Sequence, residues 1–133
     1  MRVFSVDVRQ HALGVLFVLC GELDFDSVVQ LHEAADAELN GSTGTLPVVV
    51  DCTALTFCDS SGISALLRLY QQLTAEQRSL RLAAVPASVS RLFSLTGLDQ
   101  LFSVHKDAAE ALAAGSGGRG VVSPVQQNEE RSA

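Results

Sequence analysis

Apolar and polar residues alternate in some parts of the chain and form unbroken apolar runs in others. Residues 3–9 alternate, which indicates a strand at the edge of a sheet. Residues 14–20 form an unbroken apolar run, which predicts a central strand buried on both faces. Shorter apolar runs beside turn-forming residues predict three further strands, at residues 47–52, 80–85 and 101–105.

Between these runs, apolar residues recur at the spacing of one helical face. A loop at residues 21–24 leads to a first helix over residues 28–39, with Asp26 or Ser27 as its cap. A short loop after residue 52 leads to a second helix that starts at Ser60. Two shorter helices are predicted at residues 87–96 and 107–114.

Strands that alternate with helices predict an α/β domain with a mixed sheet of about five strands and about four helices packed on it. The first two strands would form a β-hairpin, and right-handed crossovers through the helices would follow. The domain is expected to span residues 1–114. Residues 115–133 are rich in glycine and polar residues and predict a disordered tail, because they cannot bury enough apolar surface to offset the entropy cost of ordering.

Composition and charge exclude several classes of function. The formal net charge of −6 opposes binding to nucleic acid or to anionic lipid. No apolar run approaches the roughly 20 residues of a membrane span, and no leader pattern opens the chain, so a cytoplasmic location is expected. The three cysteines form no Cys-x-x-Cys pair, and His11, His32 and His105 lack the spacing of a metal site. We expect no metal and no cofactor.

The turn Cys58-Asp59-Ser60-Ser61-Gly62 stands where a strand gives way to a helix. At this edge of an open α/β sheet ligands and partners usually bind, so Ser60 is expected to be exposed. Free N–H groups in the first turn of a helix donate hydrogen bonds to a capping oxygen and favour a bound phosphate. Capping alone explains the same residues equally well, since Asp and Ser are common at the start of any helix.

Two enzymatic interpretations are weaker. Ser60-x-Gly62 matches half of the nucleophile elbow of serine hydrolases, and Asp99 and His105 follow in the order of that class. However, Cys58 replaces the first glycine of the elbow, and no glycine-rich oxyanion segment follows a strand. Glu22 and Asp24 could act as an acid–base pair, but a solvated loop explains them with fewer assumptions. We therefore expect no active site.

Three segments together resemble the STAS-domain family, in particular the bacterial anti-sigma factor antagonists. The resemblance covers approximately residues 3–112, and the segments that carry it are Gly21-Glu22-Leu23-Asp24, residues 55–63 (Leu-Thr-Phe-Cys-Asp-Ser-Ser-Gly-Ile) and residues 89–98 (Val-Ser-Arg-Leu-Phe-Ser-Leu-Thr-Gly-Leu). Each segment alone is weak, whereas the three in this order are specific.

The resemblance implies a cytoplasmic regulator of transcription and stress response that is not an enzyme. Unphosphorylated, such a protein binds an anti-sigma factor with serine kinase activity and frees the sigma factor. The kinase, which binds the ATP, then phosphorylates the antagonist, and a serine phosphatase of the PP2C type reverses the reaction. By match to the motif, Ser60 is the expected phosphoacceptor, with Ser61 as the alternative one residue away.

The expected partner-binding residues are Gly21, Glu22, Leu23, Asp24, Phe57, Cys58, Asp59, Ser60, Ser61, Gly62 and Ile63. Among them, Asp59 would cap the helix and orient the Ser60 hydroxyl, and Gly62 would leave space for the backbone of the partner. An alternative is a STAS-type scaffold or docking module that is never phosphorylated.

Overall fold

The computed structural model describes residues 4–41 and 44–114, which form an α/β domain around one mixed sheet. The strands lie in chain order: β1 (Ser5–His11), β2 (Gly14–Leu23), β3 (Val48–Cys58), β4 (Leu80–Ala83) and β5 (Ser103–His105). β1 and β2 form an antiparallel hairpin, whereas β2, β3, β4 and β5 run parallel to one another. The predicted fold class, with its initial hairpin, is confirmed.

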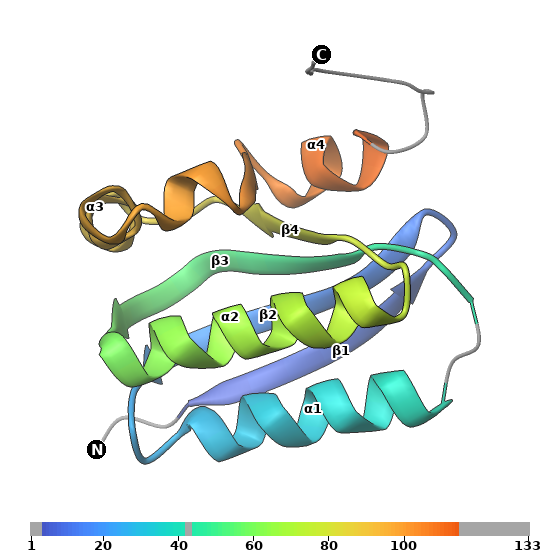
Figure 1. The fold of residues 1–133 in the computed structure, drawn as a ribbon, viewed down its shortest axis with the longest axis horizontal. Helices are drawn as coiled ribbons and strands as arrows, with labels where there is room; N and C mark the ends of the chain where they lie inside the picture. The colour runs from blue at the N-terminus through green and yellow to red at the C-terminus, as the bar shows by residue number, and fades with distance from the viewer. Residues whose placement is uncertain (1–3, 42–43, 115–133) are drawn as a thin grey trace.

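The helices cover the two faces of the sheet unequally (Figure 1). α1 (Val28–Gly41) and α2 (Ser60–Ala75) pack on one face and enclose the main core, while α4 (Ala108–Ala113) packs on the other face over a smaller cluster around Val49. α3 (Ala87–Thr96) and the 3₁₀ turn Leu98–Gln100 close the end of the main core, where the Phe93 and Phe102 rings meet edge to face.

Side chains of β3 alternate between the two cores because successive residues of a strand point to opposite faces. Val48 and Val50 enter the main core, and Val49 enters the cluster under α4. All three are fully buried. This two-sided burial explains why the strand reads as an unbroken apolar run.

β2 and β3 both extend further than their apolar runs predicted. Residues 21–23 and 53–58, which were expected to be loops, continue the parallel pairing as far as Leu23 and Cys58. The ladder stays paired through two register shifts, and Gly21 tolerates the irregularity with a φ of 103°. Polar residues in both segments interrupt the apolar pattern without interrupting the backbone hydrogen bonds.

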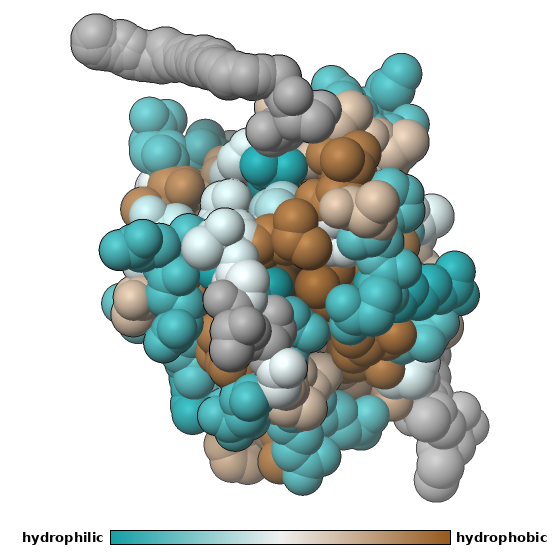
Figure 2. Space-filling model, turned by 90° about the vertical axis from the view of Figure 1, so that its right-hand side faces the viewer, coloured by the Kyte–Doolittle hydropathy of each residue, from teal (hydrophilic) through white to brown (hydrophobic). Residues whose placement is uncertain are grey.

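The edge of the sheet at which the parallel strands begin lies at the right of Figure 1. It contains the β1–β2 turn and the residues before β3 and β4. Figure 2 shows this face of the molecule, with apolar residues gathered near its middle. No helix within residues 4–41 and 44–114 has the length and apolar character needed to cross a bilayer. The predicted tail at residues 115–133 lies outside the described residues.

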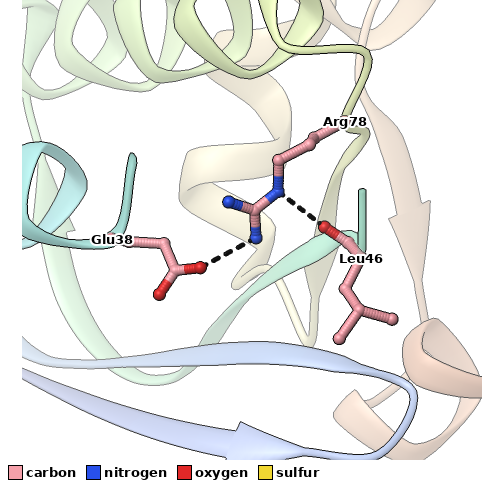
Figure 3. Close-up of polar contacts among 3 residues, drawn as sticks. All are labelled: Glu38, Leu46 and Arg78. Atoms are coloured by element: carbon pink, nitrogen blue, oxygen red, sulfur yellow. Dashed lines mark hydrogen bonds and ion pairs between the residues drawn. The ribbon is translucent and has the colours of Figure 1, made fainter. Parts of the chain in front are cut away.

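A buried ion pair joins segments that are far apart in the sequence (Figure 3). Nη2 of Arg78 lies 2.9 Å from Oε2 of Glu38 on α1, and Nε of Arg78 donates to the carbonyl of Leu46 at 2.8 Å. The two charged side chains are only 2% and 7% exposed. Gln77, in the left-handed conformation with a φ of 62°, follows the Glu76 cap of α2 and turns the chain towards this pair.

Candidate functional site

β3 passes into α2 through Asp59 alone. Oδ1 of Asp59 accepts a hydrogen bond from the Gly62 N–H at 3.1 Å, which caps the first turn of α2. The Asp59 N–H donates to the Leu23 carbonyl at 3.3 Å and ties the junction to the end of β2. The predicted capping role of Asp59 agrees with this geometry, which holds the start of α2 from two sides.

Ser60 is the first residue of α2, and its side chain is exposed. Within residues 4–41 and 44–114 its hydroxyl makes no hydrogen bond to the protein. Ser61 is half-buried, so the neighbouring hydroxyl is less accessible. The structure thus displays the Ser60 oxygen at the positive end of a helix, where added negative charge is compatible with the fold.

Gly62 is buried, so the structure contradicts the prediction that it leaves space for a partner's backbone. A Cβ atom at this position would lie 2.6 Å from Sγ of Cys58 and 2.8 Å from the Leu23 carbonyl oxygen. Glycine is required here because α2 approaches the ends of β2 and β3 of its own chain too closely for any side chain.

Replacement of Gly62 by alanine is expected to destabilise the protein by about 1–3 kcal/mol, because the added methyl group overpacks a site that includes rigid backbone. Gly41→Ala is the matched control, since a Cβ atom at Gly41 would have no neighbour within 4 Å. Urea denaturation of both variants measures the difference. A Gly62→Ala variant as stable as Gly41→Ala would contradict the close approach.

The two predicted segments at this end of the sheet lie side by side. Glu22 pairs with Phe57, and Leu23 pairs with Cys58, across the β2–β3 ladder. Leu23 and Cys58 are buried in the main core and therefore support the surface from beneath, whereas Phe57 is 46% exposed. We call the surface formed by residues 21–26 and 57–63 the Ser60 edge.

A rigid turn extends the Ser60 edge towards α1. Oδ1 of Asp24 accepts from the Asp26 and Ser27 N–H groups, at 3.0 and 3.1 Å. The Ser27 hydroxyl donates to the Glu22 carbonyl at 2.8 Å and accepts from the Asp24 N–H at 2.9 Å. Ser27, one of the two predicted caps of α1 beside Asp26, therefore faces the turn before it. Its side chain does not cap the helix, contrary to that prediction.

This turn presents an aromatic residue that the sequence analysis did not single out. Phe25 is 79% exposed, and Val29, the second residue of α1, is 51% exposed. Large apolar side chains that face solvent beside polar residues often mark protein-binding surfaces. The signal in the sequence was a phenylalanine between two aspartates immediately before a helix.

The charge of the Ser60 edge is entirely negative. Residues 21–26 and 57–63 contain no lysine or arginine, and their four carboxylates are Glu22, Asp24, Asp26 and Asp59. A phosphate on Ser60 would therefore meet other negative charges and no cation within these segments.

The cysteines of β3 are not suited to nucleophilic chemistry. Burial, and secondarily the charge of Asp59, raises the pKa of Cys58 to about 12. Burial raises the pKa of Cys52 to about 12 as well, with Asp51 as a smaller contributor. Both side chains are thus thiols at neutral pH, when only a thiolate is an effective nucleophile.

Thiol labelling should distinguish these cysteines from Cys20, which is exposed. At pH 8 we expect one thiol per native chain to react rapidly with an aromatic disulfide reagent, because a thiol with a pKa near 12 is ionised to only about one part in ten thousand. In denaturant all three should react. Rapid reaction of more than one native thiol would contradict the burial of β3.

The hydrolase alternative requires residues that the structure keeps away from Ser60. His105 pairs in register with Ala83, which pairs with Asp51 on β3. At about 3.3 Å per residue, Asp51 precedes the end of β3 at Cys58 by more than about 20 Å. Nε2 of His105 instead contacts Oγ of Ser103 at 2.8 Å, and Asp99 accepts from Ser94 at 3.4 Å. Ser60 therefore has neither a general base nor an acid from this predicted set.

Solved structures with the same fold include antagonists of anti-sigma factors. An anti-sigma factor antagonist from Mycobacterium paratuberculosis superposes with a TM-score of 0.74 and 26% identity, covering 84% of this chain and 93% of that one. The anti-sigma factor antagonist SpoIIAA in its unphosphorylated form also gives a TM-score of 0.74, with 22% identity over 87% of this chain and all of its own. The second likeness shows a shared fold.

Sequence comparison leads to the same group of proteins. The anti-sigma-B factor antagonist of Staphylococcus aureus is 28% identical over 86 residues, which is 65% of this chain and 78% of the relative. The sequence pattern of the family described as "Mlab, STAS domain" matches residues 6–105, which include the Ser60 edge and all five strands except Ser5, the first residue of β1. The chain therefore belongs to the STAS-domain family.

Proposed function

We propose that this protein is an anti-sigma factor antagonist, which binds its partner through the Ser60 edge and is released when Ser60 is phosphorylated. The observation that carries the proposal is the exposed Ser60 hydroxyl, held at the start of α2 by the Asp59 cap. The names of the relatives support it, because the S. aureus and M. paratuberculosis proteins are both antagonists of anti-sigma factors. Ser61, being half-buried, is the weaker candidate acceptor.

Binding would depend on apolar contacts at the Ser60 edge. Phe25 and Phe57 are 79% and 46% exposed, and Val29, four residues after Phe25, is 51% exposed. Aromatic side chains that enter pockets of a partner often contribute most of the binding energy of an interface. The carboxylates around them would favour a basic surface on the anti-sigma factor.

Phosphorylation would release the partner through charge. A phosphoserine carries roughly −1.5 to −2 charges at neutral pH, and it would stand next to Asp59 on a chain of formal charge −6. Burial of that charge without a cation costs several kcal/mol, whereas about 1.4 kcal/mol already weakens binding tenfold. The dipole of α2 offsets only about 0.3–1 kcal/mol of this penalty, and in the unbound chain the same interaction favours the folded state.

The proposal specifies the class of each partner. The anti-sigma factor would itself be a serine kinase that supplies the ATP site, a phosphatase of the PP2C type would restore the active form, and all would meet in the cytoplasm. This chain would contribute no catalytic residue. Its role would be to present one hydroxyl and one surface.

Phosphorylation can be tested directly with the cognate kinase. After incubation with that kinase and ATP, intact-mass analysis should show one added phosphate, and peptide fragmentation should assign it to Ser60. The Ser60→Ala variant should remain unmodified. A wild-type chain that binds the anti-sigma factor but is never modified would instead support the constitutive docking module. The hydrolase alternative would require ester hydrolysis by the wild type that is lost in Ser60→Ala.

A further inference from the structure

A pocket lies at the edge of the sheet opposite the Ser60 edge. It has a volume of about 330 Å³, and it opens between the β1–β2 turn, the residues that precede β3 and β4, and α4. Its apolar walls include Leu13, Leu46, Pro47 and Leu112, and Arg81 lines it from β4. Leu13 and Leu46 are 39% and 42% exposed, so part of the apolar wall faces solvent.

The guanidinium of Arg81 is only partly used by the protein. Nη1 donates to the carbonyl of Ala111 at 2.9 Å, which leaves four of the five N–H donors without a protein acceptor in the described part of the chain. No carboxylate within residues 4–41 and 44–114 forms an ion pair with Arg81. Arg78, three residues earlier, is by contrast paired with Glu38.

Burial makes this unpaired cation costly. Arg81 is half-buried, and burial lowers its pKa with no neighbouring carboxylate to oppose the shift. A half-buried guanidinium beside an apolar cavity is a strong site for a planar anion, because it can donate two parallel hydrogen bonds to a carboxylate. The remaining donors of Arg81 are available for this purpose.

The size and charge of the pocket limit the class of ligand. Its volume lies at the small end of the range of ligand pockets, roughly 300–1,000 Å³. At about 30 Å³ per water-sized group, it holds on the order of ten non-hydrogen atoms, fewer than a nucleotide contains. Since Arg81 is the cation among the lining residues, a single negative charge is the best match.

We propose that this pocket binds a small monocarboxylate with an apolar chain, whose carboxylate pairs with Arg81 and whose chain contacts Leu13, Leu46 and Leu112. The inference is independent of the proposed function, because none of these residues belongs to the Ser60 edge. Ser60→Ala should therefore leave this binding unchanged.

Hexanoate is a suitable probe, and its binding to the full chain can be followed by amide chemical shifts in two-dimensional NMR. We expect saturable shifts at Leu13, Leu46 and Arg81, with the amides of residues 57–63 unmoved. Hexanamide, which has the same chain without the charge, and acetate, which has the charge without the chain, should each bind at least tenfold more weakly. Shifts that do not saturate, or equal binding of hexanamide, would overturn the proposal.

Variants test the two sides of the pocket separately. Arg81→Met should weaken hexanoate binding at least tenfold, whereas Arg68→Met, at an exposed position of α2, should not change it. Because Arg81 also anchors α4 through Ala111, the exposed Leu13 offers a second test that spares the fold. Leu13→Glu should weaken binding several-fold relative to Leu13→Lys. Identical affinities for these two variants, or for Arg81→Met and the wild type, would refute a carboxylate site at Arg81.

Discussion

Ser60→Asp is expected to bind the anti-sigma factor at least about tenfold more weakly than Ser60→Ala, a difference of about 1.4 kcal/mol. The aspartate adds one negative charge to an exposed edge that already contains Asp59 and no cation within residues 57–63. Phosphoserine, with roughly −1.5 to −2 charges, should weaken binding further than aspartate does. Calorimetric or surface-based titration of the three forms against one partner preparation gives the ranking.

Ser79→Asp provides the matched control for this experiment. Ser79 is exposed and precedes β4, at the opposite edge of the sheet, so the same substitution changes the net charge equally without touching the Ser60 edge. Its affinity for the partner should equal that of the wild type. If both aspartate variants lost affinity to the same extent, net charge would be responsible and the local switch would be wrong.

Glu38→Leu is expected to destabilise the protein by about 3–5 kcal/mol, because it leaves the Arg78 charge buried without a counterion. The Arg78 side chain is 2% exposed, and one of its nitrogens, Nη1, already has no hydrogen-bond partner within the described residues. The double variant Glu38→Leu/Arg78→Met removes both charges and should recover most of the loss. Urea denaturation of the wild type, the single variant and the double variant measures all three free energies of unfolding.

The exposed ion pair on β1 is the control for the buried one. Nε of Arg9 lies 2.8 Å from Oδ2 of Asp7, close to the 2.9 Å of the buried pair, but the side chains of Asp7 and Arg9 are 56% and 63% exposed. Asp7→Asn should therefore change the free energy of unfolding by less than about 1 kcal/mol. A similar loss from Asp7→Asn and Glu38→Leu would mean that burial of the Glu38–Arg78 pair does not determine the cost.

The apolar pattern predicted which elements exist better than it predicted where they end. Residues 14–20 and the helical face from Ile63 onward are long and regular, and both fall in elements of the expected type. The extensions of β2 to Leu23 and of β3 to Cys58 depend on each strand pairing with the other. A sequence pattern contains no information on such a partner, so polar residues in these extensions were interpreted as loops.

The candidate site shows the same division between local and distant determinants. The exposure of Ser60 and the cap from Asp59 follow from their position at the start of a helix, and both were expected. The role of Gly62 depends on Leu23, which lies far away in the sequence and close in space. Arg78 and Glu38 are likewise 40 residues apart, and the pocket at Arg81 combines several separate segments, so neither could be read from local spacing.

The single-residue junction between β3 and α2 restricts how the length of this protein can vary. One residue inserted between Cys58 and Ser60 would rotate α2 by about 100° and shift it by about 1.5 Å if the helix kept its place. A different side chain would then occupy the exposed first position, and Leu66 would leave the core. Insertions and deletions should therefore be tolerated elsewhere on the surface long before they are tolerated here.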